Sequence, residues 1–570
     1  MDTLQAERPV EKAGVFRPLA AGIAAAALLD ACSGGDNSAP ASTPDSAMHA
    51  SLKAAATSIS STAASRFLSQ AAFGGNDTDI AAVQAQGYAG WLQDQFTTAS
   101  DQNNWDWLMA NGFDVAANLN AASGIDATLW RKLMASKDKL RQRVALALSE
   151  IFVVSVVDLH SHWKSFAAAA YMDMLAANAF GNFRTLLQAV TLSPAMGCYL
   201  GTRGNEKENP ATGREADENY AREVMQLFTI GLYQLNNDGS QILDGGGNPV
   251  PTYNATTVTQ LAQVFTGWNF DGYTQSAPNY LQVPMTLNPA QHSTSAKPFL
   301  GASVPAGTDG NTALKIALDA LFNHPNVPAF FGKQLIQKFV TSNPSPAYIG
   351  RVAAAFISGT GSAAGVRGDM KSVISAVLLD PEAQTAPGAT NPAAGKVREP
   401  ILRLAQWART FNARSPSGQW AVGDTSSSSY RLGQSPLRSP TVFNFFSPGF
   451  VPPNNVLGNP SLVAPELQIV TESTVIGYVN FMQQVVAGQL ADITPDYSNE
   501  LALASNPAAL VARLNTLLAA GQLSSATTTA IQNAIGSISL SGANAASGAS
   551  NRVKAAVLLV MSTPEYLVQK

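Results

Sequence analysis

Residues 217–232 read DENYAREVMQLFTIGL, and this stretch combines the two patterns that decide the fold. Apolar side chains recur at helical spacing and predict one buried stripe: Ala221, Val224, Met225, Phe228 and Leu232. Polar side chains occupy the neighbouring positions: Glu218, Asn219, Arg222, Glu223 and Gln226. Only 13% of the 570 residues are charged, so this density of polar groups is unusual for the chain. The stretch therefore predicts a helix and suggests a candidate site.

Helical periodicity recurs along most of the chain, whereas alternating strand patterns are few and short. Further helices are predicted at 66–74, 77–96, 129–155, 165–180, 182–192, 256–268, 312–324, 327–340, 347–357, 369–379 and 398–411, with four more before the C-terminus. We therefore expect an all-α fold, a single large helical domain over 61–570 with irregular packing. Long embedded loops are expected at 198–216, 233–255, 269–310 and 412–465.

The N-terminus has the pattern of an export signal. Basic residues precede an apolar run at 19–29, which is too short to span a bilayer as a mature helix. The run ends in LDAC, so we interpret 1–31 as a lipoprotein-like signal peptide with lipidation at Cys32. Residues 32–60 are rich in Ser, Ala, Thr and Pro and predict a tether. The alternative is an ordinary secretory signal with an incidental cysteine, and both predict an exported protein, in the periplasm or at the outer membrane or cell surface.

Charge and cysteine content exclude several classes of protein. The net charge of −4 provides no long-range attraction for nucleic acid or acidic lipid, so we expect no nucleic-acid partner and membrane contact through the lipid anchor alone. Cys32 and Cys198 are the only cysteines, which leaves no disulfide framework or cysteine metal cluster. Cys198 is flanked by apolar residues and is expected to be a small buried hydrophobe. No GxGxxG, P-loop, HExxH or GxSxG motif stands in a supporting context.

The polar residues of 217–232 form two rows spaced by four residues, one with Glu218 and Arg222 and the other with Asn219 and Glu223. Exposed pairs of this kind contribute only ~0.3–0.5 kcal/mol each. A buried Arg222 would require a carboxylate partner, and its removal would cost on the order of 3–5 kcal/mol. Because the chain is poor in charge, we expect Arg222 to be buried, and a structural network is favoured over a catalytic one.

Histidine is scarce, with five in the chain, and His292 lies in QHSTSAKPFLG close to Lys297. We hypothesise one site with catalytic Glu218, Glu223 and His292, which are also candidate ligands for a divalent metal. Its ligand-binding residues would be Asn219, Arg222, Lys297, Trp268 and Asn205. The alternative is a core polar network plus an exposed loop histidine, and His292→Ala is expected to leave folding nearly intact. A weaker metal pattern is DLHSHW, with Asp158, His160 and His162.

Several stretches in order along the chain resemble one bacterial exported family of unknown function, number eighteen hundred in its series. The matching pieces are SRFLSQAAFG, LRQRVALALSEIFVVS, NAFGNFRTLLQAVTLSPAMGCYL, DENYAREVMQLFTIGL, FTGWNF, HSTSAKPFLG, GKVREPILRLAQWAR, SPTVFNFFSPGF and RVKAAVLLVMSTPEYLVQ. The resemblance covers nearly the whole mature chain, and ENYARE is its most specific motif. It implies a secreted or lipid-anchored protein and, as a partner, a second exported family that is similar to sulfatases. It implies no particular reaction.

Two classes of function therefore stay open. One is an enzyme, with or without a divalent metal, that acts on an extracellular polymer or its anionic substituents through a polar cleft. The other is a non-catalytic envelope scaffold or escort protein for a sulfatase-like partner. Convergence of His292 on Glu218 and Glu223 would favour the enzyme. A broad exposed aromatic surface would favour the scaffold, with candidates Phe443, Phe445, Phe446 and Phe450.

Overall fold

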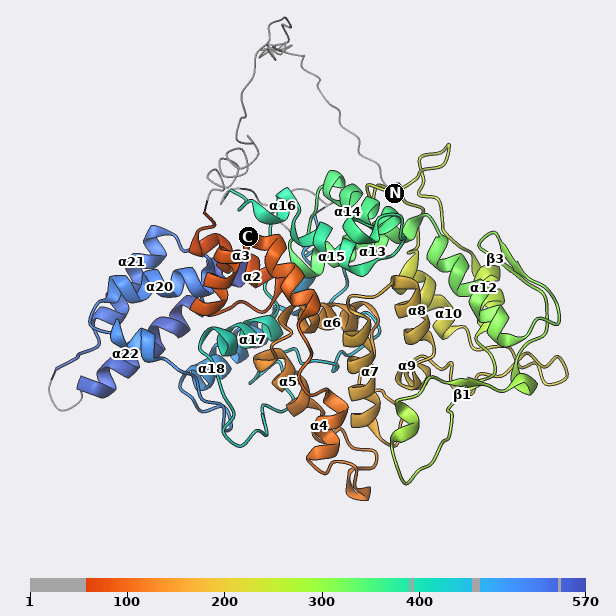
Figure 1. Ribbon diagram of the computed structural model, residues 1–570, viewed down its shortest axis with the longest axis horizontal. Helices are drawn as coiled ribbons and strands as arrows, with labels where there is room; N and C mark the ends of the chain where they lie inside the picture. The colour runs from red at the N-terminus through yellow and green to blue at the C-terminus, as the bar shows by residue number, and fades with distance from the viewer. Residues whose placement is uncertain (1–57, 389–390, 392–393, 454–461, 542–544) are drawn as a thin grey trace, which may run out of the picture. The chain divides into compact units, whose positions relative to one another are not determined.

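The computed structural model describes residues 58–388, 391, 394–453, 462–541 and 545–570. Helices dominate these residues, and the strands pair only as two-stranded antiparallel sheets (Figure 1). The predicted all-α fold is confirmed. The signal peptide and Cys32 lie outside the described residues, as does most of the tether, so the prediction of a lipid anchor stays a prediction.

The N-terminal part of the described chain is a series of short and medium helices. In chain order they are α2 (Ser61–Ala71), α3 (Asp77–Thr97), α4 (Asn104–Ala110), η1 (Ala116–Asn118), α5 (Ile125–Ala135), α6 (Lys139–Ile151), α7 (Lys164–Asn178), α8 (Phe183–Thr191), α9 (Pro194–Tyr199), α10 (Asn219–Glu223), η2 (Val224–Thr229) and α11 (Ala255–Val264). The loops predicted at 198–216 and 233–255 are irregular, with isolated bridges such as that of Tyr233 to Pro251.

The middle of the chain holds two small hairpins and then returns to helices. The elements are β1 (Trp268–Asn269), η3 (Asn279–Leu281), β2 (Thr286–Leu287), η4 (Pro289–Gln291), β3 (Lys297–Phe299), β4 (Ala302–Val304), α12 (Gly310–Asn323), α13 (Asn326–Phe339), α14 (Pro346–Ser358), η5 (Gly361–Ala363), α15 (Met370–Leu378), α16 (Pro381–Gln384), β5 (Lys396–Val397) and α17 (Pro400–Thr410). Strand β1 pairs with β2, and β3 pairs with β4.

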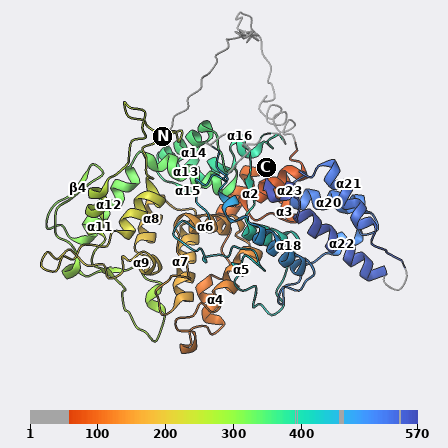
Figure 2. The same cartoon turned by 180° about the vertical axis from the view of Figure 1, so that it is seen from behind.

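The C-terminal part follows the segment 412–465, for which a loop is predicted; its described residues 412–453 and 462–464 contain no helix or strand. Its elements are η6 (Pro465–Ile469), α18 (Glu472–Val486), α19 (Ser498–Ala502), α20 (Pro507–Ala519), α21 (Ser525–Gly536), α22 (Ala545–Met561), α23 (Pro564–Leu567) and β6 (Val568–Gln569). Helices α20, α21 and α22 pack together (Figure 2). Strand β6 pairs with β5, where Lys396 faces Gln569, so the end of the chain lies beside the start of α17.

Buried apolar side chains form two clusters within the compact unit Ser58–Lys570. The larger cluster includes α2, α7, α8 and α13, and the smaller one includes α17, α18, α20 and α22. Helix α6 contributes to both, because Val144 belongs to the larger cluster and Leu146 to the smaller. Helix α13 packs against α14, α15, α6 and η2, so its polar residues stand where several elements meet.

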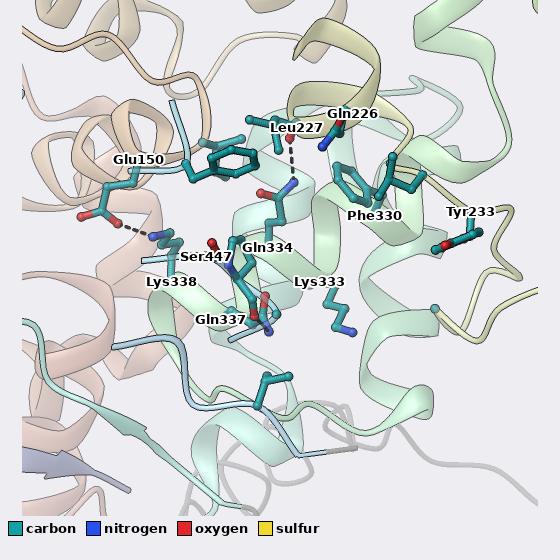
Figure 3. A pocket seen from close by; sticks show the side chains of 18 of the residues that line it. Glu150, Gln226, Leu227, Tyr233, Phe330, Lys333, Gln334, Gln337, Lys338 and Ser447 are labelled. Atoms are coloured by element: carbon teal, nitrogen blue, oxygen red, sulfur yellow. Dashed lines mark hydrogen bonds and ion pairs between the residues drawn. The ribbon is translucent and has the colours of Figure 1, made fainter. Parts of the chain in front are cut away.

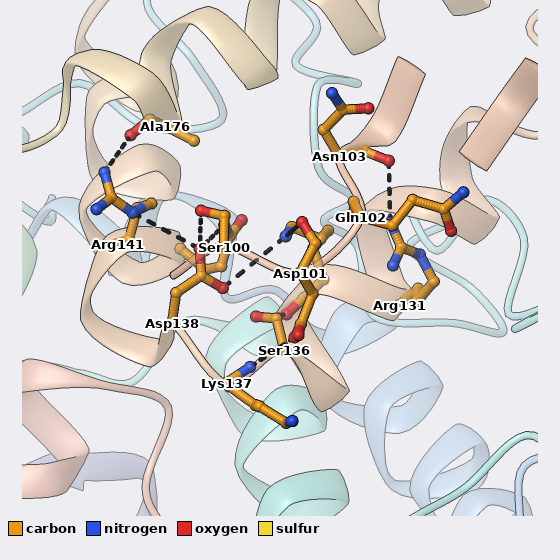
Figure 4. Close-up of polar contacts among 12 residues, drawn as sticks. Ser100, Asp101, Gln102, Asn103, Arg131, Ser136, Lys137, Asp138, Arg141 and Ala176 are labelled. Atoms are coloured by element: carbon orange, nitrogen blue, oxygen red, sulfur yellow. Dashed lines mark hydrogen bonds and ion pairs between the residues drawn. The ribbon is translucent and has the colours of Figure 1, made fainter. Parts of the chain in front are cut away.

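The long helix predicted over 129–155 is interrupted. Helix α5 ends at Ala135 and α6 begins at Lys139, with Asp138 at the break (Figure 4). The Asp138 side chain is fully buried; it accepts hydrogen bonds from Ser100 Oγ at 2.6 Å and from Gln142 Nε2 at 2.9 Å. Asp and Ser favour helix ends because their short side chains compete for the backbone. The prediction of one continuous helix was therefore wrong at Ser136 to Asp138.

The stretch 217–232 also differs from a regular helix. Helix α10 spans only five residues, and the backbone then widens into a π-helix over Val224–Thr229. The amide of Ile230 donates to the carbonyl of Met225 at 3.0 Å, which is the five-residue spacing of a π turn. The apolar stripe is buried up to Phe228, but Leu232 is exposed. Gln226 and Leu227 belong to this π-helix, and both line a cleft described below.

Candidate functional site

The residues predicted to share one site fall into separate environments. Glu218 and Arg222 form an ion pair at 3.0 Å, but their side chains are 37% and 47% exposed. Glu218 also accepts a hydrogen bond from Thr259 Oγ1 of α11 at 2.6 Å. Asn219 is exposed, and its backbone amide donates to Asp217 Oδ1 at 2.8 Å. The expectation that Arg222 is buried is wrong, because the row spaced by four residues faces outward on a short helix.

Glu223 differs from its neighbours because it is buried. It is 8% exposed, and its Oε2 has no hydrogen-bond partner among the described residues. Burial raises the pKa of this carboxyl, and the nearby Arg222 partly opposes the shift. Glu223 is therefore a buried acid that favours the protonated state more than an exposed glutamate does.

His292, Asn205 and Trp268 meet around Gly267 at the end of α11. His292 Nδ1 lies 3.0 Å from the Thr266 carbonyl, and the Gly267 amide donates to the Asn205 carbonyl at 2.7 Å. A Cβ at Gly267 would lie 2.8 Å from the Asn288 carbonyl oxygen, so this junction requires glycine. Trp268 and His292 are both buried, at 3% and 2% exposure. These three residues therefore connect the segment after α11 with the loops that carry Asn205 and His292.

The burial of His292 corrects the expectation of an exposed loop histidine. Its Nε2 is buried and has no hydrogen-bond partner among the described residues. Burial lowers the pKa of the imidazole, which favours the neutral form. Lys297 is also fully buried and donates to the carbonyls of Ser293 at 2.7 Å and Ser295 at 3.0 Å. Because the Lys297 ammonium donates to these two backbone carbonyls, it stabilises the loop that carries His292.

The structure does not bring Glu218, Glu223 and His292 into one metal-binding group. Across the described ranges, no three His, Cys, Asp or Glu side chains are placed to hold a metal ion. Helix α11 contacts both α10 and β3, so it separates the glutamates from the loop of His292 and Lys297. Asn205 bridges the two regions, because its Oδ1 accepts from the Asp217 amide at 2.9 Å. The hypothesis of one shared site has no support from this geometry.

A larger site is lined in part by the π-helix. It is a cleft of about 680 Å³, which is a typical size for a ligand pocket (Figure 3). Its amide side chains are Gln226, Gln241, Gln334 and Gln337. Its aromatic side chains are Tyr233, Phe330, Phe443 and Phe446, and its charged ones are Glu150, Lys333 and Lys338. We call it the amide-lined cleft.

Helix α13 supplies much of one wall because its lining residues share one face. Phe330, Lys333, Gln334, Gln337 and Lys338 are three or four residues apart, which is the spacing of neighbours on a helix surface. Gln334 Nε2 donates to the Leu227 carbonyl of the π-helix at 3.3 Å, as Figure 3 shows. Gln337 Nε2 donates to the Ser342 carbonyl at 3.0 Å. These bonds fix both amides before any ligand arrives.

The inner end of the cleft contains a buried ion pair. Glu150 Oε2, from the last turn of α6, lies 2.8 Å from Lys338 Nζ, and the two side chains are only 6% and 7% exposed. The Glu399 carboxyl is a second hydrogen-bonding neighbour of Glu150. The ammonium of Lys338 also lies 4.5 Å from the centre of the Phe446 ring. Glu150 is thus a buried carboxyl that lies between the Lys338 ammonium and the Glu399 carboxyl.

This ion pair belongs to a wider buried group of charges beneath the cleft. Lys396 Nζ lies 3.3 Å from Glu399 Oε1 and 3.2 Å from Glu466 Oε1, with all three side chains at most 3% exposed. Gln434 Nε2 donates to Glu399 Oε2 at 2.8 Å. Arg143 is buried as well and donates to the Lys338 carbonyl at 2.5 Å. We call these groups, with Glu150 and Lys338, the buried charge network.

The network shifts the two nearest carboxyls in opposite directions. Burial, together with the charge of Glu399, raises the pKa of Glu150 to about 7, against the attraction of Lys338. Glu399 is buried too, but Lys396 and Lys338 hold its pKa well below the usual range. Two carboxyls with opposite shifts are typical of sites that use one as an acid and keep the other ionised. Structural ion pairs also cause such shifts.

Sequence reasoning missed the amide-lined cleft, although two signals were present. Glu150 is the only acid in the apolar stretch VALALSEIFVV at 144–154. The stretch FFGKQLIQKFV at 330–340 repeats polar residues at helical spacing inside an apolar helix. Neither signal says that the two helices meet, because that contact depends on packing between distant segments. Cys198 is buried as expected, and burial raises the pKa of its thiol to about 11.

The comparisons with known proteins identify a family and no characterised relative. The family described as "Protein of unknown function (DUF1800)" matches residues 66–568. No curated protein and no solved structure is significantly similar to the chain. In the described part of the chain, none of the helices combines the length and apolar character needed to cross a bilayer.

Proposed function

The chain belongs to this family of unknown function, and we propose that it binds a saccharide chain in the amide-lined cleft, with Glu150 as the acid–base group. The observation that carries the proposal is the Glu150 carboxyl at the inner end of the cleft, which lies 2.8 Å from the Lys338 ammonium and has its pKa raised to about 7. The proposal replaces the earlier hypothesis of a site around His292.

The lining of the cleft favours a saccharide over an apolar or strongly charged ligand. Amide side chains donate and accept hydrogen bonds, which suits the hydroxyl groups of a sugar. Aromatic rings offer flat apolar faces for the C–H faces of sugar rings, and Phe443 is 43% exposed at the cleft. Among the described residues, the charges that line the cleft are those of Glu150, Lys333 and Lys338.

Glu150 is suited to proton transfer near neutral pH. A general acid works best when its pKa lies close to the working pH, and the pKa of Glu150 is raised to about 7. In its protonated form it donates a proton to a glycosidic oxygen, and in its ionised form it accepts one from water. Lys338 stabilises the ionised form and holds the carboxylate at the inner end of the cleft.

The first experiment measures binding of neutral oligosaccharides by calorimetry and their cleavage by product analysis. Phe443→Ala should weaken binding about tenfold, because the ring face is lost. Tyr430→Ala is the matched control, since Tyr430 is 67% exposed and lies outside the cleft. Glu150→Gln should keep binding but abolish cleavage. Unchanged binding by Phe443→Ala would contradict the amide-lined cleft as the binding site, and cleavage by Glu150→Gln would contradict the role of Glu150.

The scaffold alternative receives less support from the same region. Phe443 is exposed, but Phe446 is only 3% exposed and lies against Lys338, while Phe445 and Phe450 are half-buried. These four rings therefore do not make a broad exposed aromatic surface. Association with a sulfatase-like exported protein is a proposal that co-purification of the two proteins would test.

Export and anchoring through Cys32 complete the proposal. They rest on the N-terminal sequence pattern and agree with a ligand outside the cell. Cys32→Ala should release the protein from the membrane fraction into the soluble fraction. Retention in the membrane would contradict an anchor made of lipid alone.

A further inference from the structure

A second cavity, of about 310 Å³, is lined by several basic side chains. Its lining residues differ from those of the amide-lined cleft. His160, His162 and Lys164 come from the segment before and at the start of α7, and Arg203 comes from the loop after α9. No carboxylate lines the cavity, and neither Lys164 nor Arg203 has an ion-pair partner among the described residues. We call it the basic pocket.

Aromatic rings form another part of the basic pocket. Phe270 and Tyr273 are stacked, with centroids 5.8 Å apart and planes at 21°. Tyr280 packs against both rings, with centroids 4.7 Å from Phe270 and 5.0 Å from Tyr273. The guanidinium of Arg203 lies 4.7 Å from the centre of the Phe270 ring. Tyr273 is 50% exposed, so part of its ring is free to contact a ligand.

Two buried hydroxyl groups line the pocket and act on each other as hydrogen-bond partners. They are Tyr280 Oη and Ser161 Oγ, in residues that are 3% and 9% exposed. Burial raises the pKa of Tyr280 to about 12, so its hydroxyl stays protonated and can donate. A hydroxyl group can donate one hydrogen bond and accept others, so this pair keeps capacity for the hydroxyl or anionic oxygens of a ligand.

Local structure fixes the orientation of one histidine in the pocket. His162 Nδ1 lies 3.1 Å from Asn120 Oδ1, and the Asn120 amide donates to the His162 carbonyl at 2.6 Å. Asn120 has a φ of 62°, a left-handed conformation that asparagine tolerates better than most residues. Because Oδ1 is an acceptor, Nδ1 carries a proton, and Nε2 is left for another partner.

We propose that the basic pocket binds an acidic sugar residue, one that carries a carboxylate or a sulfate ester. Arg203 and Lys164 receive the anion, because both are cations without an ion-pair partner in the described chain. The sugar ring lies against Tyr273, and its hydroxyl groups meet Tyr280 and Ser161. The net charge of −4 disfavours a nucleic-acid strand as the occupant. This site is independent of the amide-lined cleft and of Glu150.

The test uses the full chain and calorimetry with four probes. A uronate disaccharide and a sulfated disaccharide represent the two acidic groups, a neutral disaccharide omits the anion, and inorganic sulfate omits the sugar. At least one acidic disaccharide should bind ten times more tightly than both the neutral disaccharide and inorganic sulfate. The acidic disaccharide that binds more tightly identifies the preferred anion, a carboxylate or a sulfate ester. Equal affinity for inorganic sulfate would overturn the proposal, because it would indicate an adventitious ion only.

Variants then locate the binding. Arg203→Gln and Tyr273→Ala should each lower the affinity for the acidic disaccharide about tenfold. Arg414→Gln is the matched control, because Arg414 is exposed and lies outside the pocket, and it should change nothing. Phe443→Ala, in the amide-lined cleft, should also leave this binding intact.

Three results would overturn the proposal. One is unchanged binding by Arg203→Gln, one is tighter binding of a mononucleotide than of either acidic disaccharide, and one is no binding at all. Circular dichroism checks that each variant is folded. If Arg203→Gln fails to fold, Lys164→Gln replaces it with the same expected tenfold loss, and unchanged binding by that variant would overturn the proposal equally.

Discussion

Two glutamate–cation pairs in this molecule have nearly the same separation and opposite surroundings. Glu218 and Arg222 are 3.0 Å apart and Glu150 and Lys338 are 2.8 Å apart. The first pair is 37% and 47% exposed, and the second is 6% and 7% exposed. Water screens the first pair and is excluded from the second. The comparison teaches that burial, more than distance, decides what a charge pair does for stability and for chemistry.

The two pairs also differ in how they arise from the sequence. Glu218 and Arg222 are four residues apart on one short helix, so the pair follows from local geometry alone. Glu150 and Lys338 come from α6 and α13, and they meet only because these helices pack together. The local pair is easy to predict and contributes little. The distant pair is hard to predict, and the buried charge network depends on it.

The largest effect is expected from removing the cation of the buried pair. Lys338→Met should lower the free energy of unfolding by on the order of 3–5 kcal/mol, because Glu150 and Glu399 lose a buried counter-charge. Chemical denaturation at pH 8, where Glu150 is mostly ionised, measures the change. Lys315→Met is the matched control, since Lys315 is 74% exposed in its ion pair with Asp319. Similar stability for the two variants would break the comparison.

The second effect is a dependence of stability on pH that the exposed pair does not produce. The folded protein raises the pKa of Glu150 from 4.5 to about 7, so between these values the folded state binds more protons than the unfolded state. Stability from this group is therefore fully present below about pH 4.5 and is lost as pH rises through 7, by about 1–3 kcal/mol. The lowered pKa of Glu399 acts oppositely, and its contribution is lost as pH falls below 4.5.

Denaturation curves between pH 4.5 and 8 test this dependence. Glu150→Gln should flatten the decline, because glutamine does not titrate and resembles the protonated acid in shape. A decline that persists unchanged in Glu150→Gln would assign it to another group. Glu223, whose pKa burial also raises, is then the next residue to replace.

The third effect reverses an expectation from the sequence. His292→Ala should lower the free energy of unfolding by about 2 kcal/mol, because the imidazole is 2% exposed and packs at the Gly267 junction. His160→Ala is the matched control, since His160 is exposed on its loop and should change stability by less than about 0.5 kcal/mol. Thermal and chemical unfolding of both variants measures the difference. Equal stability of the two variants would mean that His292 contributes no more to folding than an exposed loop histidine.

Much of the fold could be predicted because helical periodicity is a local signal. The positions of α3, α7, α8 and α12 follow from their apolar spacing, and so does the scarcity of strands. The break between α5 and α6 was missed because Asp138 is held by Ser100 and by Lys132, which no local pattern reveals. The π turn after α10 was missed for a similar reason. The extra residue of a π turn shifts the apolar spacing only slightly, so the sequence still has the pattern of a regular helix.

The candidate site was harder to predict than the fold. The sequence pattern favoured polar residues that lie close together along the chain, such as Arg222. In the structure Arg222 lies on the surface. Glu150 is the only acid in an apolar stretch of α6, and Lys338 lies in a mostly apolar helix, so the sequence pattern suggests core for both. Burial raises the pKa of Glu150 to about 7, and only the packing of α6 against α13 shows that the two residues meet.

The smallest effect is expected at the exposed pair of Glu218 and Arg222. Arg222→Ala should change the free energy of unfolding by at most ~0.5 kcal/mol, because water replaces an exposed guanidinium at little cost. Glu218 keeps its hydrogen bond from Thr259 at 2.6 Å, so its carboxylate is not left without a partner. A double-mutant cycle with Glu218→Gln, in low and in high salt, measures the coupling, which should shrink as salt screens the charges. A loss of several kcal/mol would mean that Arg222 is buried in solution, and the contrast with Lys338 would then disappear.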